Sequence, residues 1–139
     1  MPIVTTIEGR IAQVAIDRPE KRNTLSSELC KDLAREFLEL NDDTRVRSIV
    51  LCGHNNVFCA GLDIEEQLAE NTPIFNEFQK VIDALDALSK PVVAAVSGPA
   101  VSQGAAMLYH CDLVFAGEHA LFSMPGLALG QTPRYGVSL

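Results

Sequence analysis

The stretch that decides the fold is KPVVAAVSGPAVSQGAA, residues 90–106. Its apolar run at residues 92–96 predicts a strand of the kind that a parallel sheet buries on both faces. A glycine–proline turn follows at residues 97–99, and a helix of small residues is expected to begin near Gln103. A buried strand that leads through a loop into a helix is the repeating unit of parallel α/β folds.

The same alternation continues on both sides of this stretch. A turn at Gly9 between two β-rich runs predicts a hairpin. Ser26 or Ser27 can cap one helix, and Thr72, with Pro73 in the first helical position, can cap another. The expected strands are 4–7, 11–16, 48–52, 92–96, 113–116 and 120–122. The expected longer helices are 27–40 and 73–88. The second of these helices is expected to bury a stripe formed by Phe75, Phe78, Ile82, Leu85 and Leu88. This order indicates an α/β fold wound as a right-handed βαβ coil with parallel strands.

Length and composition limit the classes of protein to consider. A chain of 139 residues is long enough for one core, so we expect a single domain over 1–139. A formal net charge of −7 argues against nucleic acid or an anionic membrane as the main partner, because both select basic surfaces.

No apolar run reaches the roughly eighteen residues of a membrane-spanning helix, and no signal-peptide pattern opens the chain. Four widely spaced cysteines indicate free thiols and a cytoplasmic location.

Charge is sparse in the last third of the chain. From residue 91 to residue 139 the only formal charges are Asp112, Glu118 and Arg134. Such a segment is expected to be buried within this chain or against a partner. We therefore expect either a fragment, an incomplete single domain, or an obligate unit of an oligomer.

Two loops carry the groups suited to chemistry. The first, residues 60–63, joins a strand to a helix, where backbone N–H groups have no intrahelical partner. Gly61 gives this loop freedom to approach a ligand closely, so that the Leu62 N–H can point into a cleft, and Asp63 is expected to cap the helix. Taken alone, the loop has an equally simple interpretation, because glycine often does no more than begin a helix.

The second loop, residues 97–106, is of the same kind. Its helix start, around Gln103 and Gly104, presents N–H groups at the positive end of the helix dipole. Two such donors aimed at one point polarise a carbonyl and stabilise an enolate or a tetrahedral intermediate. The two loops together therefore predict a site for the carbonyl oxygen of an acyl thioester.

Five ordered motifs resemble the crotonase (enoyl-CoA hydratase/isomerase) family. They are RPEKRNTL (18–25), FCAGLDI (58–64), KPVVAAVSGPA (90–100), CDLV (111–114) and LGQTP (129–133). The resemblance implies a crotonase-like β-β-α spiral, here truncated before its C-terminal helices. It further implies a coenzyme A thioester as substrate, no permanently bound cofactor, and a trimer or a dimer of trimers in the full-length form.

The resemblance also assigns site residues. The backbone N–H groups of Leu62 and Gln103 match the oxyanion pair of the family. The stretch that wraps the adenine and pantetheine of coenzyme A corresponds to Ala60, Gly61, Leu62, Asp63 and Ile64. Lys21 or Arg22 is placed to meet a phosphate of the nucleotide, although both also fit a solvated loop without a ligand.

The expected carboxylates are missing. Hydration needs a pair of them to activate water and to deliver a proton. The resemblance places the two glutamates of the hydratases at positions that hold Ala106 and Gly126 in this chain. It places the single glutamate of the isomerase branch at the position that holds Arg134. Other proton carriers are few: His54 and His119 are expected on the surface and His110 in a satisfied environment, while Tyr135 and Ser123 lie nearer the expected cleft. None of them is a convincing general base.

Two alternatives to an acyl-CoA enzyme remain open. The first is a non-catalytic scaffold that binds acyl-CoA or other subunits, which the lost carboxylates favour. The second is a serine hydrolase of the Clp type, because the loop around Ser102 resembles a nucleophile turn. That chemistry needs a histidine within reach of Ser102, and none follows at a suitable place.

Overall fold

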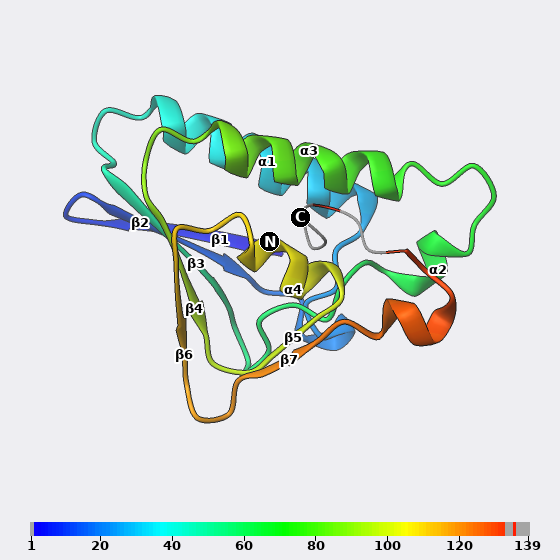
Figure 1. The fold of residues 1–139 in the computed structure, drawn as a ribbon. Helices are drawn as coiled ribbons and strands as arrows, with labels where there is room; N and C mark the ends of the chain where they lie inside the picture. Colours follow the sequence, from blue (N-terminus) through cyan, green and yellow to red (C-terminus); the bar gives the residue numbers. More distant parts are fainter. Residues whose placement is uncertain (1, 133–134, 136–139) are drawn as a thin grey trace.

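A five-stranded sheet forms one wall of the molecule (Figure 1). The computed structural model describes residues 2–132 and 135. The strands are β1 (Ile3–Glu8), β2 (Ile11–Ile16), β3 (Ser48–Gly53), β4 (Val92–Val96) and β6 (Leu113–Ala116), in the order β1-β2-β3-β4-β6. The β1–β2 hairpin is antiparallel and every other pair is parallel, as the sequence predicts.

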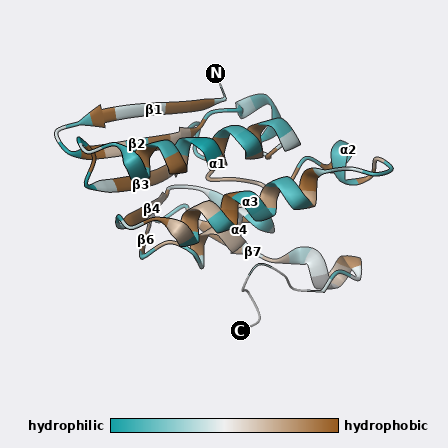
Figure 2. Cartoon of the chain, turned by 90° about the horizontal axis from the view of Figure 1, so that it is seen from above, coloured by the Kyte–Doolittle hydropathy of each residue, from teal (hydrophilic) through white to brown (hydrophobic). Residues whose placement is uncertain are grey.

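Helices α1 (Ser27–Asp42) and α3 (Ile74–Ala87) lie side by side over the sheet (Figures 1 and 2). Ser26 caps α1 by accepting a hydrogen bond from the Leu29 N–H. It is one of the two serines, Ser26 and Ser27, that the sequence predicts as the cap. Both helices alternate hydrophilic and hydrophobic residues in Figure 2, and their apolar side chains enter the common core. The largest fully buried side chains on these two helices are Leu29, Leu33, Phe37, Ile74 and Phe78.

The third helix begins one residue later than predicted. Pro73 is the N-cap of α3, and Thr72 Oγ1 accepts a hydrogen bond from the Ile74 N–H at 3.3 Å. The predicted buried stripe is confirmed at Phe78, Ile82 and Leu85. Ile74 and Val81 are fully buried, whereas Phe75 and Leu88, expected in that stripe, are only partly buried.

A second, two-stranded sheet lies beside the first. It pairs β5 (Pro99–Val101) with β7 (Leu121–Ser123) in parallel, and between them the chain forms α4 (Gln103–Leu108) and β6. The sequence did not predict β5, because its glycine–proline start is typical of a turn. Proline is tolerated as the first residue of a strand, where its missing N–H breaks no ladder bond. The remaining elements are α2 (Ile64–Gln67) and two 3₁₀ turns, η1 (Pro19–Lys21) and η2 (Pro125–Leu129).

The last third of the chain is buried only in part. Residues of β4 and of α4 up to Met107 enter the core, but all four residues of β6 are exposed, with Phe115 exposed by 66%. Strands β6 and β7 are therefore not buried within this chain, so of the two expected forms of burial only burial against a partner remains for them. In the described residues, no helix has the length and apolar character needed to cross a membrane.

Candidate functional site

The two loops predicted to act together are joined by backbone hydrogen bonds. The Cys59 N–H donates to the Pro99 carbonyl at 3.2 Å, and the Val101 N–H donates back to the Cys59 carbonyl at 2.9 Å. Gly104, in the first turn of α4, packs directly on this junction. A Cβ atom at position 104 would lie 2.1 Å from the Cys59 carbonyl oxygen, so only glycine fits.

In the first loop, one backbone donor is left over. The Ala60 N–H donates to the Arg22 carbonyl, the Gly61 N–H contacts Cys59 Sγ at 3.5 Å, and the Asp63 N–H donates to the Leu25 carbonyl. Within the described residues the Leu62 N–H makes no hydrogen bond. Leu62 is only 2% exposed, and buried N–H groups are rarely left unpaired. The predicted donor is thus the unpaired one.

The second loop repeats this arrangement. The Ser102 N–H donates to the Ser123 carbonyl at 2.8 Å, and the Ser102 carbonyl accepts from the Ala106 N–H at 2.9 Å. Between them, the Gln103 N–H has no acceptor in the part of the chain that the structure describes. The loops also touch here, because a Cβ on Gly61 would lie 3.3 Å from the Gln103 side chain.

An internal framework holds the first loop in place. Asp63 caps α2, as predicted, by accepting from the Glu65 N–H at 3.0 Å, and its second oxygen pairs with Arg18 Nη2 at 3.2 Å. Arg18 Nη1 also donates to the Thr24 carbonyl. Asn23 is fully buried and bridges the loop to residues 54–57 through hydrogen bonds to the His54 and Val57 carbonyls. The Asp63 carboxylate is therefore occupied by structural contacts.

The two predicted phosphate-binding residues differ in their surroundings. Lys21 Nζ forms an ion pair with Glu65 Oε1 at 3.2 Å. Arg22 is exposed in a left-handed conformation (φ 53°), and its carbonyl is the acceptor for Ala60. Among the described residues its guanidinium has no carboxylate partner. Arg22 is thus the cation of this loop that is free to meet an anionic ligand.

Of the three positions expected to hold carboxylates, the structure describes Ala106 and Gly126. Ala106 is 1% exposed within α4, and Gly126 lies in η2, where it contacts Gln131. Arg134 lies outside the described residues. Among the residues that are described, no cluster of three or more His, Cys, Asp or Glu side chains is placed to hold a metal ion.

The histidines are engaged elsewhere or exposed. His110 contacts Asp86 through Nδ1 at 2.7 Å and the Tyr135 carbonyl through Nε2 at 2.6 Å, in agreement with the expected satisfied imidazole. His119 is exposed, as predicted, and His54 is partly exposed near Asp17. Ser102 Oγ bonds to Gln103 Oε1 rather than to an imidazole. This contact gives the serine-hydrolase alternative no support.

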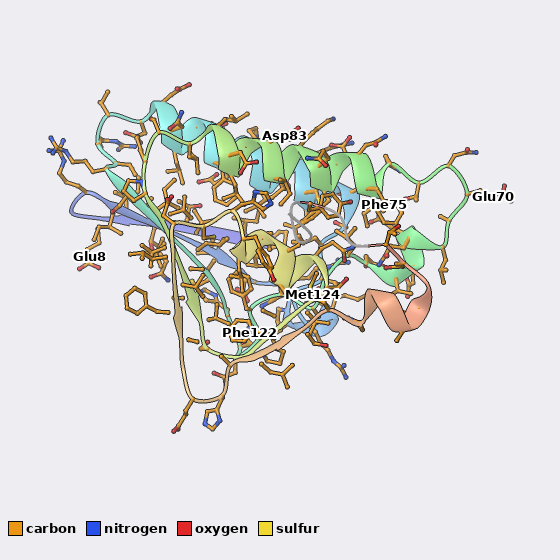
Figure 3. All side chains as sticks on the ribbon, viewed as in Figure 1. Glu8, Glu70, Phe75, Asp83, Phe122 and Met124 are labelled. Carbon is orange, nitrogen blue, oxygen red and sulfur yellow. The ribbon has the colours of Figure 1, made fainter. Side chains whose placement is uncertain are left out.

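An apolar pocket of about 350 Å³ opens beneath α4, and the sequence did not predict it. Its walls come from α4, β6 and the end of β7, and Figure 3 shows Phe122 and Met124 below α4. The lining residues are Ala105, Leu108, Tyr109, Val114, Phe122, Ser123 and Met124. Of these, only Ser123 was expected near the cleft. The only sequence signal for this pocket is the apolar run 113–116, which predicts a strand and contributes Val114 to the lining.

The buried thiols make the stability of the protein sensitive to alkali. Burial raises the pKa of both Cys59 and Cys111 to about 12, from 9.0, so the unfolded chain releases these protons first as the pH rises. The free energy of unfolding should then fall between pH 9 and 12, by about 1.4 kcal/mol per pH unit for each thiol. Urea unfolding at pH 8, 9.5 and 10.5 measures this slope. The variant Cys111→Ala should show a smaller slope, and an unchanged slope would contradict the assignment.

Comparisons of sequence and of structure with known proteins all match the chain to the same family. The sequence profile of the enoyl-CoA hydratase/isomerase family matches residues 6–139. The short-chain-enoyl-CoA hydratase of Clostridium acetobutylicum is 35% identical over 139 residues, which cover 96% of this chain and 53% of that protein. The 2,3-dehydroadipyl-CoA hydratase of Escherichia coli is 32% identical, with 96% of this chain and 53% of that protein covered.

Solved structures show the same fold. A putative enoyl-CoA hydratase/carnithine racemase from Magnetospirillum magneticum superposes with a TM-score of 0.92 at 34% identity and covers 99% of this chain, which spans 54% of that one. OdaA from Pseudomonas aeruginosa gives a TM-score of 0.90 at 36% identity, with 99% and 56% covered. The expected crotonase-like spiral is therefore confirmed. The chain spans about half the length of the relatives that it matches.

Proposed function

Because the chain belongs to the enoyl-CoA hydratase/isomerase family, we propose that it binds an acyl-CoA thioester and polarises the thioester carbonyl through the backbone N–H groups of Leu62 and Gln103. The observation that carries this proposal is the pair of unpaired donors on two touching loops. Both are donors that the family resemblance assigns to the oxyanion, and the N–H groups on either side of Leu62, those of Gly61 and Asp63, have partners within the chain.

The chemistry of such a site follows from the developing charge. A thioester carbonyl becomes more negative as an enolate or a tetrahedral intermediate forms, and two fixed donors stabilise that charge by a few kcal/mol each, on the order of a hundredfold in rate per donor. The donors belong to backbone that is already held by Arg22, Leu25 and Ser123. Little reorganisation is then required when the substrate binds.

The nucleotide end of the ligand is assigned to the loop around Arg22. This side chain is exposed and free of the acidic contacts that occupy Arg18 and Lys21. Ala60 lies next to the Arg22 backbone, since the Ala60 N–H is bonded to the Arg22 carbonyl. The proposed phosphate-binding cation therefore belongs to a segment that is joined directly to the loop of the first oxyanion donor.

Isothermal titration calorimetry with the present chain tests the proposal. We expect crotonyl-CoA to bind about tenfold more tightly than free coenzyme A, since only the thioester presents a carbonyl to the two donors. Arg22→Glu should weaken both ligands by a similar factor, about threefold to tenfold, because it acts on the shared nucleotide. Arg47→Glu, far along the chain on the exposed turn before β3, serves as the charge-matched control. Equal affinities for crotonyl-CoA and coenzyme A would contradict the thioester site.

A non-catalytic scaffold is the second candidate, and the residues at 106 and 126 favour it. Alanine and glycine at these positions leave the described site without the carboxylates that move protons. Retained binding of crotonyl-CoA with no hydration or isomerisation would support an acyl-CoA-binding scaffold. We further propose the oligomeric assembly of the family, a trimer, for the whole protein, and the exposed apolar residues of β6 and β7 are consistent with a partner surface.

A further inference from the structure

Both ring nitrogens of His110 contact oxygen atoms. Nδ1 lies 2.7 Å from Asp86 Oδ1, and Nε2 lies 2.6 Å from the carbonyl oxygen of Tyr135. A backbone carbonyl only accepts hydrogen bonds, and so does an ionised carboxylate. A neutral imidazole has one donor and one acceptor, so it can satisfy only one of these two oxygens. The geometry therefore calls for the doubly protonated imidazolium cation.

Two of the three groups in this contact belong to well-anchored backbone. His110 lies in the turn that leaves α4, and Asp112 ties this turn to β4 through hydrogen bonds from its N–H to the Val92 carbonyl and from the Val92 N–H to its carboxylate. Asp86 lies in the last turn of α3, whose apolar side chains enter the core. Tyr135 is the one group of the three that lies outside this helical and sheet framework.

The backbone of Tyr135 has an uncommon conformation. Its φ is 60°, in the left-handed region that residues with a Cβ seldom adopt. Its ring meets the ring of Phe78 edge-on, with centroids 4.7 Å apart and planes at 90°. Phe78 is fully buried in α3. Such a conformation persists where its surroundings impose it, and the hydrogen bond from His110 acts here together with the ring contact.

Loss of one proton breaks the contact on a defined side. The bond from Nδ1 to the Asp86 carboxylate is assisted by charge, and such bonds are stronger than those to a neutral carbonyl. A neutral His110 therefore keeps its proton on Nδ1 and turns a lone pair of Nε2 toward the Tyr135 carbonyl. Two lone pairs 2.6 Å apart repel each other, so the neutral ring releases this carbonyl.

The other titratable groups on the surrounding elements have partners of their own. Within the described residues, Asp86 is the only carboxylate within 4 Å of the ring nitrogens of His110. The remaining contacts are those of Asp83 with Gln79, Glu77 with Lys80, Lys90 with the Leu40 and Asp43 carbonyls, Asp112 with the Val92 N–H, and the Cys111 thiol with the Met107 carbonyl. The charge of Asp86 thus acts on the imidazole directly.

We infer that His110 is a pH-dependent clamp, which holds Tyr135 against α3 in its cationic form and releases it on losing a proton. Because the folded contact needs the proton, attachment is complete at acidic pH and is lost as the pH rises from about 6 to 8, where histidine changes charge. The clamp involves neither the Leu62 N–H nor the Gln103 N–H. It therefore stands independently of the proposed thioester site.

Acrylamide quenching of tyrosine fluorescence tests the clamp. The chain has two tyrosines and no tryptophan, so Tyr109→Phe leaves Tyr135 as the only emitter. We expect the quenching constant of this variant to be about twofold larger at pH 8 than at pH 6, because the released ring is more accessible. Adding His110→Gln, which carries no charge, should make the constant equal at the two pH values. Adding Asp86→Asn instead removes the charge that favours the imidazolium and should move the transition to lower pH.

The matched control is His119→Gln, which alters an exposed histidine between β6 and β7 and should keep the full pH dependence. Circular dichroism at both pH values shows whether each variant is folded. A quenching constant of Tyr109→Phe that does not change with pH would overturn the clamp, as would a change that survives His110→Gln. If His110→Gln does not fold, Asp86→Asn decides, because that side chain is 58% exposed. An unshifted transition in Asp86→Asn then overturns the inference.

Discussion

Gly104→Ala is expected to abolish thioester binding and to lower the free energy of unfolding by about 3 kcal/mol. The new Cβ would lie 2.1 Å from the Cys59 carbonyl oxygen and 2.9 Å from Cys59 Cβ. Neither obstacle is the end of a flexible side chain, so the backbone of one loop must move. That movement separates the Leu62 N–H from the Gln103 N–H, which is why binding and stability should fall together.

A matched glycine provides the control for this variant. A Cβ on Gly117 would meet its nearest atoms at 3.8 Å, an ordinary van der Waals distance. Gly117→Ala should therefore change the free energy of unfolding by less than about 1 kcal/mol and leave crotonyl-CoA affinity intact. Urea unfolding and calorimetry on both variants measure the two effects. Normal thioester binding by folded Gly104→Ala would show that the junction of the loops does not position the donors.

Asn23→Asp is expected to be the most damaging isosteric change in the chain, with a loss of more than about 3 kcal/mol at pH 7. Asn23 is fully buried, and its Nδ2 donates to the His54 carbonyl at 3.0 Å and to the Val57 carbonyl at 2.8 Å. A carboxylate cannot donate, so it would face two carbonyl oxygens as a buried charge. The loop that supplies the Arg22 carbonyl to Ala60 would lose its anchor.

The pH dependence of this variant identifies the cause. A protonated carboxyl is neutral and can donate to one of the two carbonyls, so the deficit relative to the unaltered chain should shrink as the pH falls from 7 to 5. Asn23→Ala removes the same donors without adding a charge, and should show a smaller deficit with no such pH dependence. Unfolding by urea at both pH values makes the comparison. A pH-independent deficit in Asn23→Asp would assign the loss to packing rather than to charge.

Most of the fold could be predicted because its signals are local. The run at 92–96 is apolar throughout, as a strand buried on both faces requires, and Ser26 stands where a helix needs a cap. The start of α3 was placed one residue early, because Thr72 and Pro73 both favour a helix start and only the observed bond to the Ile74 N–H distinguishes them. Strand β5 could not be predicted from its own residues, because it is a strand only through its pairing with β7, which lies about twenty residues further along the chain.

The candidate site stays a prediction, and the sequence indicates its two loops but not the hydrogen bonds within them. Glycines at 61 and 104 point to two loops, yet the unpaired state of the Leu62 N–H depends on Arg22 and Leu25, which accept from its neighbours. The strained φ of Ser102 has no local signal either, because serine does not call for a positive φ as glycine does. The pocket beneath α4 forms from segments that meet only in the folded chain.

The junction of the two loops has a consequence for how this protein can diversify. The donors at 62 and 103 are main-chain groups, and what aligns them is the path of the backbone, secured by the Cys59–Val101 bond and the close approach of Gly104. If the proposed function holds, mutation can exchange the side chains at 103 and 106 without removing the place where a thioester carbonyl would bind. New reactions can be acquired here by altering the surroundings of a retained anchor, while changes at Gly104 or Asn23 remove the anchor itself.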